Sequence, residues 1–230
     1  MMTTIFTESM KTGDIVTKFP GASKLFKQYK IDFCCGGNRP IGEVLQEKQL
    51  EAKDILASIS TMYEAYNQED DTDWTISSLT DLMDYIIDKY HQATREMLDE
   101  LSAFVTKVYR VHGGRDPHLK AVYDNFFLLK KDLEQHLQDE ETSIFPYIAS
   151  YEQTVSEDDL KRAKAEIDHL ESEHETAGTY LKNIRTATND FEIPEGACNT
   201  YRLTYLKLEE LESMTFDHIH LENNILFKRI

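Results

Sequence analysis

The sequence predicts an all-α protein, a small N-terminal helical domain followed by an up-and-down antiparallel four-helix bundle. Three observations support this fold class. After residue 74, four long segments repeat apolar residues at alternating spacings of three and four, as helices with one buried face do. Clear breaks separate these segments, and none alternates apolar and polar residues with the period of a strand. Helices joined by short connections pack as antiparallel bundles.

The N-terminal domain is predicted to span residues 1–66. Short helices are expected around Ser23–Tyr29 and Ile41–Gln49, and a third through Lys53–Tyr66. The polar, acidic stretch at residues 67–74, "NQEDDTDW", indicates a linker. The bundle is therefore expected to occupy residues 75–230.

Residues that stop or start helices mark the breaks within the bundle. "HGGRDP" (112–117) combines glycines with a proline that suits the first position of the next helix. In "SYEQTVSEDD", Ser156 is a good N-cap followed by acidic residues. "TNDFEIPEGACN" separates the last two helices. Each connection is short enough to join neighbouring helices.

Composition limits the classes of partner. The 25 basic and 42 acidic residues give a formal charge of −17, without a basic block, so no nucleic acid or anionic membrane partner is expected. No apolar run is long enough for a signal peptide or a membrane span. Three cysteines are too few for a disulfide framework. A cytoplasmic protein is expected.

Each bundle helix carries a histidine on its apolar stripe, and two helices add a glutamate four residues later. An unpaired carboxylate in such a position would cost several kcal/mol. Polar residues in the same kind of position on all four helices therefore predict a shared partner. The candidate residues are His91, His136, Glu140, His174, His218 and Glu222.

Helix geometry places these candidates at one height. At a rise of 1.5 Å per residue, His91 stands roughly 30 Å before His112, and His136 roughly 29 Å after Pro117. Antiparallel packing therefore brings His91 and His136 level. Counted from the next turn, His136 lies roughly 21 Å from Ser150 and His174 roughly 27 Å from Ser156, which agrees within the slack of a loop. The last junction fits less tightly, because the start of the fourth helix is uncertain.

The donor set points to two metal ions. Four histidines and two carboxylates exceed the four ligands of a tetrahedral zinc ion. They suit two ions bridged by Glu140 and Glu222, each also holding two histidines, with a solvent oxygen as a further bridge. Nitrogen and oxygen donors without thiolate favour iron or manganese.

Other histidines and glutamates fit this site less well. His112 lies on a stripe, but a continuous helix keeps it roughly 30 Å from His91. Three histidines lie off the stripes and are expected at the surface: His118, His169 and His220. Glu141, Glu171 and Glu173 flank the candidate ligands. Glu171 precedes His174 by three residues and is expected to flank the ligands rather than to bind metal itself. Most acidic residues in such places are solvated, although some of the three could line an access route.

Cys34 and Cys35 are adjacent, and two glycines and a helix follow them. Backbone dipoles there could favour thiolate, although Asp32 acts against it. Redox or metal-transfer chemistry competes with a plain interpretation as two small apolar residues in a turn. Cys198, in a predicted loop, is a weaker candidate.

Several segments together resemble the RIC (repair of iron centres) family, bacterial di-iron proteins of the YtfE/ScdA type. "KLFKQYKIDFCCGG" resembles the family's N-terminal cysteine-pair domain, whereas "IIDKYH", "VYRVHG", "ESEHETAG" and "DHIHLENNILF" resemble its hemerythrin-like domain. The resemblance implies two non-haem iron ions, oxo- and carboxylate-bridged. By position, the six candidate ligands correspond to the family's metal residues.

The resemblance also implies repair of iron–sulfur clusters and other iron centres damaged by nitric oxide or peroxide. One hypothesis is donation of labile iron to a damaged protein or scaffold, aided by Cys34 and Cys35. A second is a nitric oxide reductase at the di-iron site. A third is a module that binds or senses dioxygen or nitric oxide without turnover. The cysteine pair favours the first over the third.

Overall fold

The structure is a computed structural model that describes residues 5–66 and 72–230. Within these ranges the chain forms helices and no β-strand, apart from an isolated antiparallel bridge between Lys11 and Pro40. The predicted all-α fold is therefore confirmed. Most of the predicted linker, residues 67–71 of 67–74, lies outside the described residues.

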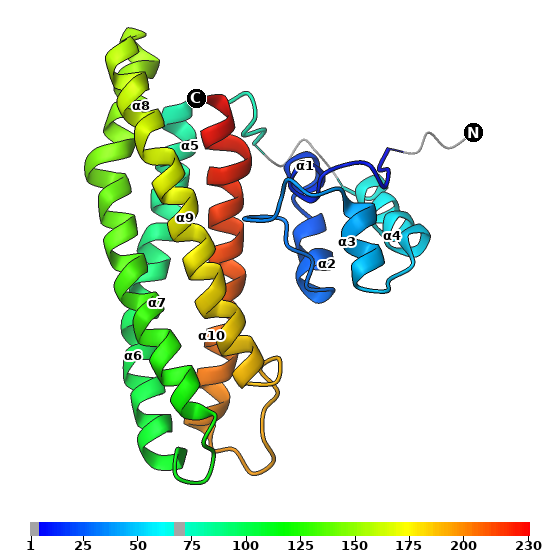
Figure 1. Ribbon diagram of the computed structural model, residues 1–230, viewed down its shortest axis with the longest axis vertical. Helices are drawn as coiled ribbons and strands as arrows, with labels where there is room; N and C mark the ends of the chain where they lie inside the picture. Colours follow the sequence, from blue (N-terminus) through cyan, green and yellow to red (C-terminus); the bar gives the residue numbers. More distant parts are fainter. Residues whose placement is uncertain (1–4, 67–71) are drawn as a thin grey trace. The chain divides into compact units, whose positions relative to one another are not determined.

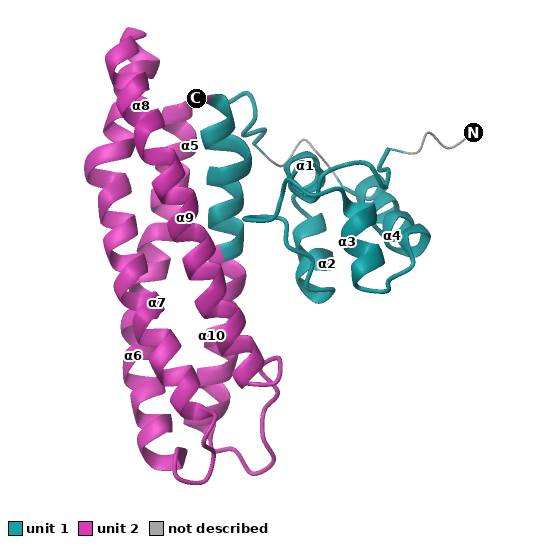
Figure 2. Ribbon diagram, in the orientation of Figure 1, with its two compact units in different colours: residues 1–78, 216–229 teal, residues 79–215, 230 magenta. Residues whose placement is uncertain are grey.

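The chain divides into two compact units, shown in Figure 2. Unit 1 comprises residues 1–78 and 216–229, and unit 2 comprises residues 79–215 with Ile230. The boundary cuts one helix between Thr215 and Phe216, so the end of the last helix groups with the N-terminal segment. The domain limits expected from the sequence, 1–66 and 75–230, stay predictions.

Unit 1 contains four short helices before the boundary of the bundle. They are α1 (Thr12–Lys18), α2 (Ala22–Gln28), α3 (Ile41–Glu47) and α4 (Ala52–Glu64). The last three match the predicted helices, whereas α1 was not predicted. Their apolar faces meet in one buried cluster, whose largest members include Phe6, Ile15, Phe26, Phe33, Leu45 and Ile59. Burial of such side chains contributes about 1.5–3 kcal/mol each, which is how these short helices are stabilised.

The bundle is built from four long helical segments, called rods below. Each of the first two rods consists of two α-helices joined by a π-helical turn. The first consists of α5 (Leu79–Ile86), a π-helical turn η2 (Ile87–His91) and α6 (Gln92–His112). The second, antiparallel to it, consists of α7 (Leu119–Asp139), a π-helical turn η3 (Glu140–Ile144) and α8 (Phe145–Thr154).

The third rod is α9 (Glu157–Ala187), and the fourth is α10 (Asn199–Leu221). Figure 1 shows α6, α7, α9 and α10 running alongside one another. A π-helical turn η4 (Glu222–Leu226) and a 3₁₀ turn η5 (Phe227–Arg229) continue α10. The four predicted bundle helices are thus present.

The predicted stripes form the core of unit 2. Their apolar members are buried, among them Leu98, Leu101, Val105, Phe126, Leu129, Leu133, Leu170, Leu181, Leu208 and Leu211. Ser156 caps α9 as expected, because its hydroxyl accepts a hydrogen bond from the backbone N–H of Asp159 at 3.3 Å. No helix in the described ranges is both long and apolar enough to cross a membrane.

The three π-helical turns all fall at candidate ligands. His91 is the last residue of η2, Glu140 is the first residue of η3, and Glu222 is the first residue of η4. π-helical turns are rare, and they occur frequently at functional sites. The regular geometry of three rods is therefore interrupted where the candidate ligands lie.

Candidate metal centre

Four of the candidate side chains converge within unit 2. Nε2 of His91 lies 3.4 Å from one oxygen of Glu140, and Nε2 of His136 lies 3.3 Å from the other. Nε2 of His174 lies 3.0 Å from Nε2 of His136. The buried carboxylate of Glu140 therefore lies between two imidazoles that come from different rods.

Helix α10 and its π-helical continuation carry the other two candidates. Nε2 of His218 lies 2.8 Å from an oxygen of Glu222. Because these residues are four apart, their side chains lie on the same face of the helix. The doubled His-x3-Glu pattern thus has the local geometry predicted for it in both rods.

The six residues form two sets of potential metal ligands. One set is His91, Glu140, His218 and Glu222, and the other is His136, Glu140, His174 and Glu222. Within each set the candidate ligand atoms lie within 4.8 Å of one another. Both sets share Glu140 and Glu222.

The burial of the six candidate ligands determines which partner they need. Glu140 and Glu222 are fully buried, and none of the four histidines is more than 2% exposed. Two ionised carboxylates at such depth need positive charge beside them. Imidazoles that bind metal through a lone pair are neutral and do not supply it. A pair of divalent ions would supply the positive charge that the carboxylates need and would accept the lone pairs of the neutral imidazoles. The residues present therefore fit a bridged pair of ions.

Two glutamates that were expected to be mainly solvated instead contact the outer sides of these histidines. Nδ1 of His91 lies 2.7 Å from a carboxylate oxygen of Glu141, and Nδ1 of His136 lies 2.8 Å from Glu173. Glu171, which was expected to flank the ligands, is exposed. The sequence offered only proximity along the chain as a signal for Glu141 and Glu173.

The remaining histidines fall outside the two sets. Nε2 of His112 lies 3.5 Å from the thiol of Cys198, and His169 is exposed. His118 is half-buried, with Nε2 at 2.9 Å from the Tyr205 hydroxyl. His220 was expected at the surface, and that expectation is wrong, because it is only 4% exposed.

His220 is buried because the helix face opposite the ligands is also covered within unit 1. Its Nδ1 donates to the backbone carbonyl of Phe33 at 3.2 Å. Burial lowers the pKa of His220 to about 4, so the ring is neutral at physiological pH. The histidine therefore contributes a hydrogen bond within unit 1 and no charge.

The two adjacent cysteines differ from each other. Both are free thiols with their sulfur atoms 3.9 Å apart, and Cys34 is buried whereas Cys35 is half-buried. A hydrogen bond to Cys35 and burial raise the pKa of Cys34 well above its ordinary value. The thiolate character expected from backbone dipoles is thus reversed at Cys34, and Asp32 adds to the effect.

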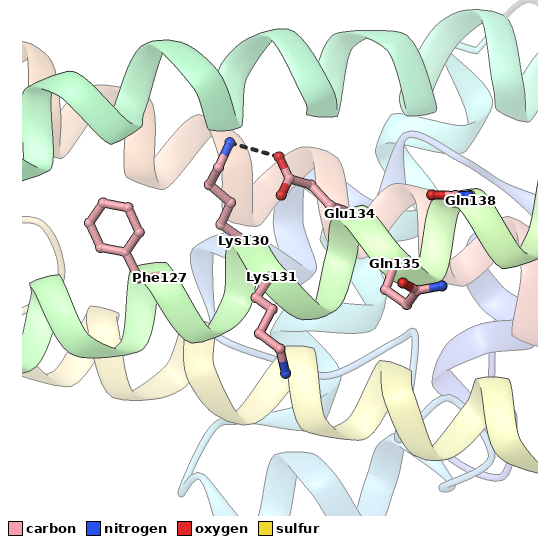
Figure 3. A pocket seen from close by; sticks show the side chains of 6 residues that line it. All are labelled: Phe127, Lys130, Lys131, Glu134, Gln135 and Gln138. Atoms are coloured by element: carbon pink, nitrogen blue, oxygen red, sulfur yellow. Dashed lines mark ion pairs between the residues drawn. The ribbon is translucent and has the colours of Figure 1, made fainter.

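A shallow surface depression lies apart from these groups, along one face of α7. Figure 3 shows its lining, which includes the ion pair between Lys130 and Glu134 at 2.7 Å. None of the six candidate ligands lines it. It plays no part in the candidate metal centre.

Residues 82–230 match the hemerythrin HHE cation binding domain, and residues 8–63 match ScdA_N, a domain of unknown function (DUF542). The probable iron–sulfur cluster repair protein of Haemophilus influenzae is 33% identical over 220 residues, 96% of each chain. The iron–sulfur cluster repair proteins YtfE of Shigella boydii and Escherichia coli are 35% identical over 217 residues, 94% of each chain.

Fold and site together define a hemerythrin-like protein, a helical bundle with a buried His/Glu cluster that fits metal binding. The second match, at the cysteine-pair segment, narrows the class further. The chain belongs to the RIC family, as its sequence motifs indicated.

Proposed function

We propose that this protein repairs iron–sulfur clusters and other iron centres damaged by nitrosative or oxidative stress, by donating labile iron from a di-iron site. The relatives named as iron–sulfur cluster repair proteins support the biological role. The observation that supports the chemistry is the pair of His₂Glu₂ sets sharing Glu140 and Glu222. The site of action proposed is the cytoplasm, and the partners are damaged iron–sulfur proteins or a scaffold.

In this proposal the protein side chains hold and release the metal. His91 and His218 would hold one ion, His136 and His174 would hold the other, and Glu140 and Glu222 would contribute to both positions. A bound iron pair would supply one-electron chemistry and a releasable ferrous ion. Carboxylate and imidazole donors hold ferrous iron weakly relative to zinc or copper, which favours release.

Cys35 is proposed as the thiol that meets the acceptor, because it is half-buried whereas Cys34 is buried. A transferred iron ion has high affinity for sulfur donors at a cluster site, and an accessible thiol can hold it during transfer. Cys34 would act as the neighbouring partner that completes a dithiol.

Metal analysis tests the proposal first. We expect about two iron ions per chain by plasma mass spectrometry on untagged protein from iron-replete medium, with near-ultraviolet oxo-to-iron absorption. The iron-loaded protein is then mixed with a nitric oxide-damaged iron–sulfur protein, and recovery of cluster absorption is followed. A single zinc ion, or no recovery with a fully iron-loaded sample, would overturn the proposal.

Nitric oxide reduction is the competing function, and the same site supports it. Each set offers four protein donors, which leaves coordination positions open on a six-coordinate iron ion. Nitrous oxide formed over many cycles with an electron donor would favour this reaction. Formation of at most one equivalent per site would favour repair, or a sensor without turnover.

A further inference from the structure

His91 belongs to one ligand set and His136 to the other. Each imidazole contacts a carboxylate at both of its ring nitrogens. Nε2 of each ring faces Glu140, and Nδ1 of each ring faces a second carboxylate, Glu141 or Glu173. Donation from Nδ1–H to a carboxylate fixes the tautomer in which Nε2 carries the lone pair. The same contact raises the strength of the imidazole as a metal donor.

The two outer carboxylates nevertheless differ in their other partners. Arg95 donates to the same oxygen of Glu141 that His91 contacts, at 2.9 Å. Glu173 contacts His136 with one oxygen and His169 with the other, at 3.3 Å. Among the described residues, Glu173 makes no ion pair with a lysine or arginine.

Solvent exposure does not account for the difference. The side chains of Glu141 and Glu173 are 27% and 28% exposed, so water screens both to a similar extent. His169, in contrast, is 69% exposed, which weakens its interaction with Glu173. The positive charge of Arg95 is thus the main electrostatic difference between the surroundings of Glu141 and those of Glu173.

Each outer carboxylate is placed to accept the Nδ1–H of its histidine, because an oxygen of Glu141 lies 2.7 Å from Nδ1 of His91 and an oxygen of Glu173 lies 2.8 Å from Nδ1 of His136.

We propose that Glu141 and Glu173 are positioning residues for His91 and His136, and that Arg95 makes the two metal positions unequal. Because Arg95 shares the carboxylate oxygen with His91, it withdraws charge that would otherwise strengthen that imidazole. The ion held by His91 and His218 is then the first to leave. This inference deepens the proposed function, on which its relevance to iron donation depends.

The release step is a ligand exchange of ferrous iron. Bonds from the ion to His91, His218 and the bridging carboxylates break, and bonds to the acceptor form. No electron is transferred, because both ions are reduced beforehand by an added reductant such as dithionite.

The test measures release kinetics on the full iron-loaded chain. After anaerobic reduction, the protein is mixed with a coloured ferrous chelator in a stopped-flow instrument. We expect two phases of equal amplitude in the unaltered protein. Arg95→Gln should slow the first phase three- to tenfold and leave the second unchanged, and Arg95→Lys should restore most of the fast rate. Arg110→Gln, an exposed arginine on the same helix, is the matched control.

Variants of the carboxylates assign the phases. Second-sphere substitutions typically change metal affinity 10- to 100-fold. Glu141→Gln should therefore accelerate the first phase by roughly that factor, and Glu173→Gln the second. A single phase in the unaltered protein, equal effects of Arg95→Gln on both phases, or loss of iron from Arg95→Gln would overturn the inference.

The outcomes separate this inference from the proposed function. Ordered release that responds to Arg95 but is accompanied by no cluster recovery leaves the positioning role intact and removes the repair role. Cluster recovery without ordered release would support the repair role and remove the positioning role. If Glu141→Gln does not fold, the variants Arg95→Gln and Arg95→Lys still test whether Arg95 makes the two metal positions unequal.

Discussion

Asn224 donates a hydrogen bond from its side-chain amide to the backbone carbonyl of Cys34, across 3.1 Å. The same amide lies 3.3 Å from the carbonyl of Phe33. A Cβ atom on Gly37 would come within 2.7 Å of Oδ1 of Asn224, so glycine permits this approach. Since Asn224 follows Glu222 by two residues, unit 1 ties the cysteine loop to the segment that carries a candidate bridging ligand.

Asn224→Ala should loosen this loop. Two carbonyls lose a buried donor, at a cost of about 1–3 kcal/mol in the free energy of unfolding. Chemical denaturation should show the loss, and Cys34 should become open to alkylation. Gln28→Ala, at an exposed amide side chain in unit 1, serves as the control and should change stability by less than about 0.5 kcal/mol. An unchanged alkylation rate at Cys34 would contradict the anchoring role.

Glu222→Gln should reduce metal binding to fewer than two ions per chain, because a neutral amide replaces a bridging carboxylate. The metal-free variant should unfold at an equal or higher denaturant concentration than the metal-free parent, since one buried charge is gone. Plasma mass spectrometry and denaturation provide the two measurements. Glu209→Gln, at an exposed position on the same helix, should retain both ions.

The cysteines should react unequally. Iodoacetamide at neutral pH should label Cys35 well before Cys34, because Cys34 is buried and its pKa is raised. Peptide mass spectrometry over time distinguishes the two sites. The double variant Cys34→Ser/Cys35→Ser should keep iron and nitric oxide binding but lose cluster restoration. Unchanged restoration would remove the proposed role of the pair.

Arg185→Gln should destabilise the bundle in a pH-dependent way. Arg185 holds the buried carboxylate of Glu212 through Nε, which lies 2.9 and 3.0 Å from its two oxygens. Removing one partner of a buried pair typically costs about 3–5 kcal/mol. Burial already raises the pKa of Glu212 above its ordinary value of 4.5, although Arg185 lowers it. Without Arg185 the pKa of Glu212 in the folded state should rise further.

The sign of the pH dependence follows from that rise. Above pH 4.5 the folded variant retains a proton on Glu212 that the unfolded chain has lost, so stability falls as pH increases towards the folded-state pKa. The deficit relative to the parent should be smallest near pH 4 and largest at neutral pH. Paired denaturation of metal-free proteins across this range measures it. A deficit that grows on acidification would be the opposite result.

The sequence was sufficient to predict the bundle, and the assignment of its six polar stripe residues as metal ligands stays a prediction. Apolar periodicity reports which face of a helix is buried, and the rise per residue reports height, so both were readable without coordinates. Helix α1 was not predicted, because seven residues that include Gly13 carry too little periodicity. Cys34 was misjudged because the burial of its thiol depends on tertiary contacts.

Side-chain partners could not be read in the same way. Whether Glu141 and Glu173 point to water or to an imidazole depends on rotamers and on neighbouring rods. The π-helical turns also escaped prediction, because the apolar pattern on either side of each turn remains helical. His220 illustrates the same difficulty, since its burial within unit 1 depends on a loop almost two hundred residues away in the chain.

The π-helical turns have a consequence for anyone who redesigns this protein. A π-helical turn holds one residue more than regular helix needs, so deleting that residue from η2, η3 or η4 would restore an ordinary α-helix. Because the wide turn takes up the extra residue, the flanking helix would keep its orientation, whereas the local geometry at His91, Glu140 or Glu222 would be lost. Selection for thermal stability alone would therefore favour a straighter, more stable bundle that lacks the geometry of the candidate metal centre.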